Sequence, residues 1–291
     1  MPLFDNDFLT RLEYLSIVSR KAFRGQLMAQ RRTKQMGGGI EFADHRQYTP
    51  GDDFRYLDWN LYARHDELLL KRFQEEEDLH VYLLLDCSRS MSTGEPPKFD
   101  LARQVTAALA YIALADLDRI SVYAFADGVL NHFPLTRGKA RILSLMRFLE
   151  SLTADGDATN MTQLAKEFVL RAPRRGLALV LSDLYDPGGF RHGLDVLRHH
   201  KYETHVVQFH HNAEAEPKML GDVELQDVET GDFRKITITE KHLANYRQVF
   251  QAFLTSVTEY CSAYGLGCTI TDTDVTFDKL VLGMMRAAGT R

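Results

Sequence analysis

The sequence contains few cysteines, and their positions favour no covalent or metal-bound framework. Cys87, Cys261 and Cys268 are its three cysteines. An odd and widely separated set provides neither the paired disulfides of a small secreted domain nor the spacing of a structural zinc site. We therefore expect a cytoplasmic protein with reduced thiols, and we do not expect an extracellular adhesion module.

Long apolar runs and an excess of positive charge are also missing. No apolar run approaches the roughly 18–20 residues that a membrane-spanning helix needs. The first residues lack the basic and then apolar pattern of a secretory signal. The formal net charge is −5 at pH 7, so no overall positive charge favours an anionic partner. We expect no membrane span and no nucleic-acid partner.

Recurring catalytic motifs are missing as well. The chain has no G-x-x-x-x-G-K-[ST] phosphate loop, so we do not expect it to hydrolyse ATP itself. It has no G-x-S-x-G elbow, and no Ser-His-Asp set can be assigned. The glycine triplet Gly37–Gly39 is preceded by no predicted strand, and we expect it to form a tight turn.

The most informative stretch that is present is a short apolar run ending in an acid. Val81–Leu85 is followed by Asp86, Ser88 and Ser90. An apolar run without alternation predicts a strand buried on both faces, as in a parallel sheet. Ligands of open α/β sheets bind beyond the carboxyl ends of the strands. The three oxygen-bearing side chains are therefore expected in a loop at the ligand-binding edge.

Two later positions offer oxygen atoms in equivalent places. Thr159 lies in a loop before a helical stretch, and Asp183 follows a second apolar run, Leu177–Ser182. Hydroxyl and carboxylate oxygens suit a hard divalent cation such as Mg²⁺ or Mn²⁺. The sequence thus predicts a metal site whose ligands are Asp86, Ser88, Ser90, Thr159 and Asp183. The alternative is that Ser88 and Ser90 cap the next helix and Asp86 caps a turn.

The order of the expected elements predicts the fold class. Strands are expected at 81–86, 119–126, 176–184, 204–209 and 265–271, and helices at 98–117, 139–152, 161–170, 190–200 and 276–288. This alternation implies right-handed crossovers and a doubly wound, mostly parallel α/β sheet. Residues 129–135 are expected to pair antiparallel at one edge. A hairpin at 222–239 and a helix at 240–264 are expected as a C-terminal elaboration.

The first 78 residues are expected to form a separate region. We expect two domains, residues 1–78 and residues 79–291. The first contains a helix at about 5–24 and an irregular arm at 41–64 that is dense in aromatic residues, Arg and Asp. Such a mixture indicates an arm held by Arg–carboxylate pairs and aromatic packing. Alternatively it is a partner-binding surface, because aromatic residues and Arg dominate interface hot spots. Lys71–Asp78 is expected to be an extended lead-in to the first strand.

The predicted ligand set resembles the metal-ion-dependent adhesion site of von Willebrand factor A domains. That site combines Asp-x-Ser-x-Ser after a strand with a later Thr and a later Asp. The matching positions are Asp86, Ser88, Ser90, Thr159 and Asp183. The resemblance implies a von Willebrand factor A-like, Rossmann-type domain.

A wider pattern resembles the bacterial family called domain of unknown function 58. The resemblance runs from about Gly37 to Thr290, and it is carried by Phe42-x-x-His45-Arg46-x-Tyr48-x-Pro50-Gly51-Asp52-Asp53-x-Arg55-x-x-Asp58-Trp59-x-x-x-Ala63-Arg64, then Lys71-x-Phe73-x-Glu75-Glu76. It implies a leader of this kind joined to a von Willebrand factor A-like domain. It also implies a role as adaptor or chaperone partner of a MoxR-type AAA+ ATPase.

Two functions fit these patterns. The first is a metal-dependent protein-binding module, in which a carboxylate of the ATPase or of a client protein completes the coordination of the ion. The second is a metal-dependent hydrolase or phosphatase with Asp86 as nucleophile or metal ligand, or Ser88 as nucleophile. The Asp86 loop lacks the second Asp of an Asp-x-Asp phosphatase loop. We therefore favour binding and do not expect an enzyme.

Overall fold

A computed structural model describes residues 3–30, 41–74, 79–172, 174–228 and 231–288. The chain divides into two compact units. The larger unit contains Met1–Arg20 and Leu79–Arg291, and the smaller unit contains Lys21–Asp78. The second stretch of the larger unit thus begins at Leu79, and residues 1–20 group with it. Gly37–Gly39 and Glu75–Asp78 lie outside the described residues.

The larger unit is built on a sheet with the strand order β10-β7-β6-β3-β4-β5. Its strands are β3 (His80–Asp86), β4 (Arg119–Phe125), β5 (Val129–Arg137), β6 (Leu177–Ser182), β7 (Glu203–His210) and β10 (Gly267–Asp272). Each neighbouring pair is parallel except β4 and β5, which are antiparallel. The predicted doubly wound, mostly parallel α/β fold is therefore confirmed, including its antiparallel edge strand.

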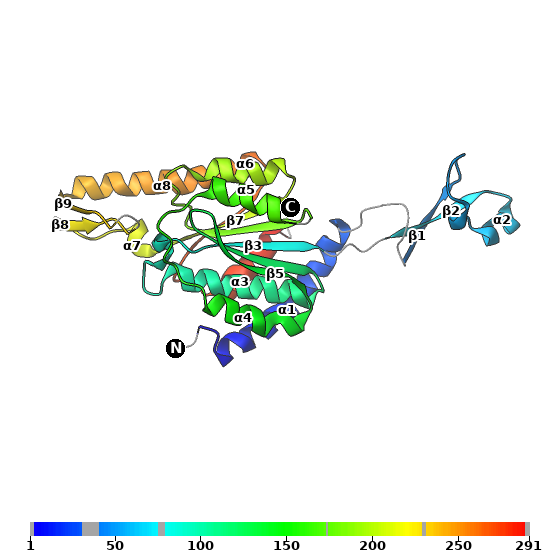
Figure 1. The fold of residues 1–291 in the computed structure, drawn as a ribbon, viewed down its shortest axis with the longest axis horizontal. Coiled ribbons are helices and arrows are strands. Elements are labelled where there is room, and N and C mark those ends of the chain that lie inside the picture. The colour runs from blue at the N-terminus through cyan, green and yellow to red at the C-terminus, as the bar shows by residue number, and fades with distance from the viewer. Residues whose placement is uncertain (1–2, 31–40, 75–78, 173, 229–230, 289–291) are drawn as a thin grey trace. The chain divides into compact units, whose positions relative to one another are not determined.

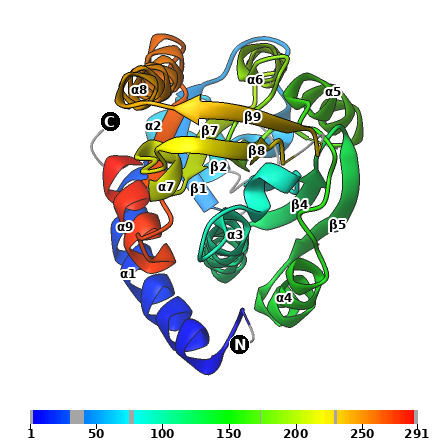
Figure 2. The same ribbon diagram turned by 90° about the vertical axis from the view of Figure 1, so that its left-hand side faces the viewer.

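Helices cover both faces of this sheet (Figures 1 and 2). One face carries α3 (Lys98–Ala115), α4 (Ile142–Glu150), α9 (Phe277–Ala288) and the first part of α1 (Asn6–Gln30), and the other carries α5 (Met161–Arg171), α6 (Phe190–His199) and α8 (Glu240–Ala263). Short helical segments are η2 (Arg89–Ser92), η3 (Lys139–Arg141) and α7 (Asn212–Ala215). Within the described ranges, no helix has both the length and the apolar composition needed to cross a bilayer.

The start of α1 is part of the larger unit because its apolar side is buried there. Phe8, Leu12 and Leu15 are at most 3% exposed, and the ring of Phe8 lies 4.5 Å from that of Phe277 in α9. The spacing of these residues forms one apolar stripe on the helix. Burial of that stripe explains why residues 1–20 do not group with the smaller unit.

The central strand β3 is buried along its whole length, as its uninterrupted apolar run predicts. Tyr82 and Leu84 belong to a core that includes Phe168 of α5 and Tyr202. The hydroxyl of Tyr82 donates a hydrogen bond to the carbonyl of Arg174 at 2.8 Å. This packing fixes the direction of β3 and therefore the place where its last residue, Asp86, leaves the sheet.

The C-terminal elaboration is a hairpin followed by a long helix. Strands β8 (Gly221–Gln226) and β9 (Phe233–Ile238) pair antiparallel, as predicted, and residues 229–230 of the expected turn lie outside the described part. Thr239 caps the start of α8. Helix α7 directly follows β7, so it lies at the same carboxyl edge of the sheet as the end of β3 (Figure 1).

The smaller unit contains more regular structure than its mixed composition suggests. Strand β1 (Glu41–Gln47) pairs antiparallel with β2 (Leu69–Gln74), and η1 (Phe54–Tyr56) and α2 (Trp59–His65) lie between them in sequence. Lys71, expected in a lead-in to β3, belongs to this separate sheet. The expected Arg–carboxylate pairs are present, with Arg46 2.5 Å from Asp52 and Arg55 2.6 Å from Asp53.

Candidate metal site

The candidate site lies where the strand order of the sheet reverses. When the strands are numbered along the chain from β3, their order is 3-2-1-4-5-6, and the reversal falls between β3 and β6. Ligands of doubly wound sheets bind outside the carboxyl ends of the strands at this reversal. Strand β3 ends at Asp86, and β6 ends at Ser182, directly before Asp183. The topology therefore brings both predicted carboxylates to the expected crevice.

The backbone fixes the loop that carries Thr159 beside the loop that follows Asp86. Ser88 and Gly156 form an isolated parallel bridge. The amide of Arg89 donates to the carbonyl of Gly156 at 3.0 Å, and the amide of Gly156 donates to the carbonyl of Cys87 at 3.1 Å. A Cβ atom at Gly156 would lie 2.3 Å from the Cβ of Ala126. Glycine is therefore required for this close approach.

A second connection joins the Thr159 loop to the loop after β6. The amide of Met161 donates to Asp186 Oδ2 at 2.8 Å, and the amide of Gly188 donates to Asp186 Oδ1 at 2.6 Å. Asp186 thus holds the first turn of α5 against the turn that follows Asp183. Together with the bridge at Gly156, this contact ties the three ligand-bearing loops to one another.

The five predicted ligands are all buried. Asp86, Ser88 and Asp183 are 0% exposed, Thr159 is 2% exposed and Ser90 is 5% exposed. The hydroxyls of Ser88 and Ser90 lie 3.0 Å apart. Ser88 precedes η2 but makes no side-chain capping bond to it. Asp86 Oδ1 does accept a bond from the amide of Ser88 at 2.9 Å, so Asp86 caps a turn as in the alternative, whereas Ser88 does not cap the helical segment that follows it.

The hydroxyl of Thr159 is the least satisfied group of this set. Its Oγ1 is buried, and it has no hydrogen-bond partner among the residues that the structure describes. A buried polar atom without a partner destabilises a protein by about 1–3 kcal/mol. Its free lone pairs are available to a cation, and the residues present therefore fit a metal-binding role.

The carboxylate of Asp86 is buried close to the charge of Asp183. Asp86 Oδ2 accepts a short 2.5 Å hydrogen bond from the hydroxyl of Ser182. Burial and the nearby charge of Asp183 nevertheless raise the pKa of Asp86 to about 7. Two ionised carboxylates in a buried site repel each other unless a cation lies close by. A metal ion bound beside Asp86 would therefore reduce this repulsion, in addition to the ammonium of Lys98, which pairs with Asp183 at 2.8 Å.

Sequence reasoning did not find Lys98, which is a prominent charged group at this edge. Its side chain is 0% exposed, and its Nζ donates to Asp183 Oδ2 at 2.8 Å and to Glu214 Oε1 at 2.6 Å. Burial lowers the pKa of Lys98, but the charges of Asp183 and Glu214 outweigh this effect and raise it. The group therefore remains an ammonium ion.

No local pattern could have identified Lys98 or Glu214. Lys98 is the first residue of α3 and reads as an ordinary helix-start residue, while Glu214 lies 116 positions later in α7. Ser182 was missed for a different reason, because it stands at the end of an apolar run. Its position directly before a predicted ligand was the available signal.

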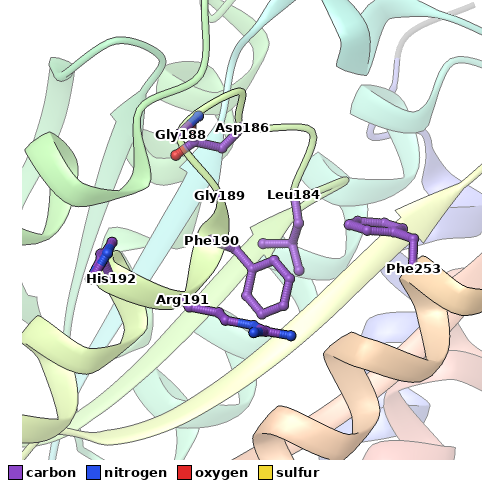
Figure 3. Close-up of a pocket in the computed structure, with 8 residues that line it drawn as sticks. All are labelled: Leu184, Asp186, Gly188, Gly189, Phe190, Arg191, His192 and Phe253. Atoms are coloured by element: carbon purple, nitrogen blue, oxygen red, sulfur yellow. The ribbon is translucent and has the colours of Figure 1, made fainter.

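A separate cavity of about 410 Å³ lies beside this edge (Figure 3). Leu184, Phe190 and Phe253 form its apolar side, and Arg191 and His192 also line it. The carboxylate of Asp186 is the acidic group of this lining, and both of its oxygens already accept backbone hydrogen bonds. Within the described ranges, no three His, Cys, Asp or Glu side chains gather to hold a metal. A cation site in this part of the chain would therefore have to include other oxygen ligands, as the predicted set does with its three hydroxyls.

Comparison with known families gives a match over most of the chain. The model of the family described as Protein of unknown function DUF58 matches residues 44–257. The uncharacterized protein Rv1480 of Mycobacterium tuberculosis is 26% identical over 206 residues, which cover 69% of this chain and 65% of that protein. The uncharacterized protein YeaD of Bacillus subtilis is 27% identical over 125 residues, covering 43% and 29% respectively. The chain thus spans just under two thirds of the length of Rv1480.

Solved structures with a similar arrangement are more distant. The conserved hypothetical protein BatB from Bacteroides thetaiotaomicron has a TM-score of 0.45 and 14% identity, covering 73% of this chain and 100% of that chain. Proximal thread matrix protein 1 from the mussel byssus, solved with a zinc-occupied MIDAS motif, has a TM-score of 0.41 and 12% identity, covering 72% and 47%. At these values neither structure assigns a ligand or a partner to this chain.

Proposed function

Because the chain belongs to the family described as Protein of unknown function DUF58, we propose a function for it from the chemistry of its own site. The protein is a metal-dependent protein-binding module. A Mg²⁺ or Mn²⁺ ion is held at the carboxyl edge of the sheet and binds a carboxylate of a partner protein. The residues that would hold the ion are Asp86, Ser88, Ser90, Thr159 and Asp183.

One observation carries this proposal. The buried hydroxyl of Thr159 has no hydrogen-bond partner among the described residues, and its loop is bonded to the loops that follow two buried carboxylates. A site evolved only for stability would satisfy such a hydroxyl with a donor or acceptor of its own. A cation accounts for the hydroxyl and for the two carboxylates together.

The donor set favours binding of an acid. Mg²⁺ prefers about six oxygen ligands, so five protein side chains leave a position for one more oxygen. Two of the five are carboxylates and three are neutral hydroxyls, so the ion when bound supplies positive charge that attracts an incoming carboxylate. No nucleophile with an adjacent base belongs to the set, and we therefore propose a binding role without catalysis.

We propose that the partner is a MoxR-type AAA+ ATPase or a client protein that offers an acidic side chain. This assignment is supported by the family resemblance. The sequence has no phosphate loop, so the energy of ATP hydrolysis would come from the partner. The protein would then act as an adaptor that attaches to the ATPase or to the client when the metal is bound.

Thr159→Val is the sharpest test of the metal site. Valine has the shape of threonine but lacks the oxygen, and the hydroxyl it replaces has no described partner, so the variant should be at least as stable as the wild type without metal. In the wild type, Mn²⁺ at 100 times its dissociation constant should raise the free energy of unfolding by about 2.7 kcal/mol. Thr159→Val should lose most of this increase in thermal unfolding experiments.

A wild-type melting temperature that is the same in millimolar Mn²⁺, in millimolar Mg²⁺ and in chelator would contradict the metal site. The partner is tested by capture of proteins from the native cell extract. A AAA+ ATPase should be retained by the wild type with metal, and released by chelator or by Thr159→Val. Equal retention in all three conditions would rule out a metal-mediated contact.

A further inference from the structure

The buried ammonium of Lys98 is close enough to the candidate metal site to influence it. It is bonded to Asp183 at 2.8 Å and to Glu214 at 2.6 Å, and it lies 4.8 Å from the centre of the Tyr185 ring. A fully buried lysine is unfavourable unless its charge is compensated. Here two carboxylates and an aromatic face compensate it.

When a metal ion is bound, Asp183 would therefore interact with two cations, the ion and the ammonium of Lys98. It is a predicted metal ligand, and it already neutralises Lys98 in the structure. When a divalent ion binds Asp183, the ammonium and the ion approach the same carboxylate and repel each other. The free energy of metal binding is reduced by this repulsion and by the weakened bond between Lys98 and Asp183.

Glu214 is placed to keep Lys98 neutralised when Asp183 turns to the metal. Its Oε1 also accepts a bond from the Thr93 hydroxyl at 3.1 Å, and its Oε2 accepts from the amide of His211 at 3.0 Å and from the Tyr185 hydroxyl at 3.4 Å. These donors hold the carboxylate of Glu214 beside Lys98 independently of Asp183. The ammonium then retains one of its two anionic partners in the metal-bound state.

We propose that Lys98 is an internal cation that competes with the metal for Asp183, and that Glu214 acts through Lys98 to limit this competition. The inference deepens the proposed function and rests on it, since it concerns the same ion. Without metal, the positive charge of Lys98 neutralises the buried carboxylate of Asp183, which reduces the cost of burying that carboxylate on folding. The pair of Lys98 and Glu214 thereby sets the metal affinity and makes binding readily reversible.

The test is titration of the full chain with Mn²⁺, with free Mn²⁺ followed by electron paramagnetic resonance. Lys98→Met removes the competing charge and should lower the dissociation constant at least tenfold. Glu214→Gln leaves Lys98 with Asp183 as its one carboxylate and should raise the constant several-fold. Lys139→Met is the matched control, because this exposed lysine contacts Tyr111 instead, and its dissociation constant should equal that of the wild type.

The double variant Lys98→Met, Glu214→Gln separates an effect through Lys98 from a simple loss of negative charge. If Glu214 acts through Lys98, the double variant should bind Mn²⁺ as tightly as Lys98→Met alone. A double variant that remains several-fold weaker than Lys98→Met would overturn the role given to Glu214. If Lys98→Met does not fold, Glu214→Gln decides, and an unchanged dissociation constant in that variant overturns the inference.

The outcomes also separate this inference from the proposed function. Equal binding by the wild type and Lys98→Met overturns the competition and leaves the metal site in place. If Lys98→Met binds Mn²⁺ and the wild type does not, the competition is supported, but the metal dependence proposed for the wild type is contradicted. Absence of binding in both proteins overturns both proposals.

Discussion

Aspartate residues have opposite electrostatic environments in the two units. At the carboxyl edge of the larger unit, burial and the charge of Asp183 raise the pKa of Asp86 to about 7. In the smaller unit, hydrogen bonds lower the pKa of Asp52 and of Asp58 to about 2, with Arg46 the main donor to Asp52 and His45 the main partner of Asp58.

The contrast separates carboxylates that the protein supplies with donors from the carboxylates of the predicted metal site. Asp58 also accepts bonds from the amides of Asn60 and Leu61 and caps α2. The protein thus supplies Asp52 and Asp58 with their own donors. The charge of Asp183 acts on Asp86, and the ammonium of Lys98 pairs with Asp183. The following tests either break this contrast or sharpen it.

The largest effect on metal affinity is expected when a carboxylate of the candidate site loses its charge, and the same change in the smaller unit is the comparison. Asp86→Asn removes a charged ligand at nearly constant volume, and we expect metal affinity to fall at least 100-fold. Asp58→Asn, in the smaller unit, should leave the affinity unchanged. Calorimetric titration with Mn²⁺ measures both. Comparable losses in the two variants would show that the contrast has no bearing on metal binding.

The next test concerns the backbone that holds the site. Gly156→Ala introduces a Cβ atom against Ala126, so the Thr159 loop has to move. We expect a loss of about 1–3 kcal/mol in unfolding free energy and a metal affinity at least tenfold weaker. Gly283→Ala is the control, because its Cβ would meet no atom within 4 Å and alanine favours the helix by about 0.5–1 kcal/mol. Denaturant unfolding with and without Mn²⁺ measures both effects.

A smaller effect is expected when one donor to the buried carboxylate is removed. Ser182→Ala deletes the hydroxyl that bonds Asp86 Oδ2 and accepts from the amide of Leu184. We expect a loss of about 1–3 kcal/mol in stability, part of which should be regained on adding Mn²⁺. Ser256→Ala, whose hydroxyl bonds a helix carbonyl, should change stability by no more than about 0.5 kcal/mol. If Ser182→Ala and Ser256→Ala lost equal stability in chelator, the hydrogen bond from Ser182 to Asp86 would contribute no more than an ordinary helix-surface bond.

The smallest effect is expected in acid, where the stability of the smaller unit should change in a defined direction. Asp52 and Asp58 have a folded pKa of about 2 against an ordinary value of 3.8. The stability they contribute is therefore present above about pH 3.8 and is lost as the pH falls through about 2. Trp59, the one tryptophan of the sequence, lies in α2 and reports this unit by its fluorescence.

Asp58→Asn provides the comparison for the acid titration. The variant cannot gain a proton at this position, so its fluorescence transition should depend less on pH than that of the wild type. The same transition in both proteins would show that Asp58 does not carry the acid sensitivity of the smaller unit.

The features predicted correctly from the sequence are local in origin. The apolar runs at β3 and β6 identified buried strands, and the residues that end them, Asp86 and Asp183, followed from the general position of ligands in such sheets. Hydroxyl residues two and four positions after Asp86 belonged to the same local pattern. The structure brings these loops together, and their role as metal ligands stays a prediction.

The features that were missed depend on partners far away in the sequence. Lys98 becomes part of the site through Glu214, 116 positions away. The assignment of residues 1–20 to the larger unit depends on contacts such as that between Phe8 and Phe277. In the smaller unit, β1 and β2 lack a clear alternation of apolar and polar residues, so their pairing could not be inferred from either strand alone.

The course of the chain has a mechanical consequence. The smaller unit is an insertion, since the chain leaves the larger unit after Arg20, within α1, and re-enters it at Leu79, directly before β3. Tension applied to the insertion would therefore load β3 in shear against its neighbours β4 and β6. The opposite end of that strand is Asp86. A motor that pulls on the smaller unit would thus strain the strand whose far end carries a predicted ligand of the ion.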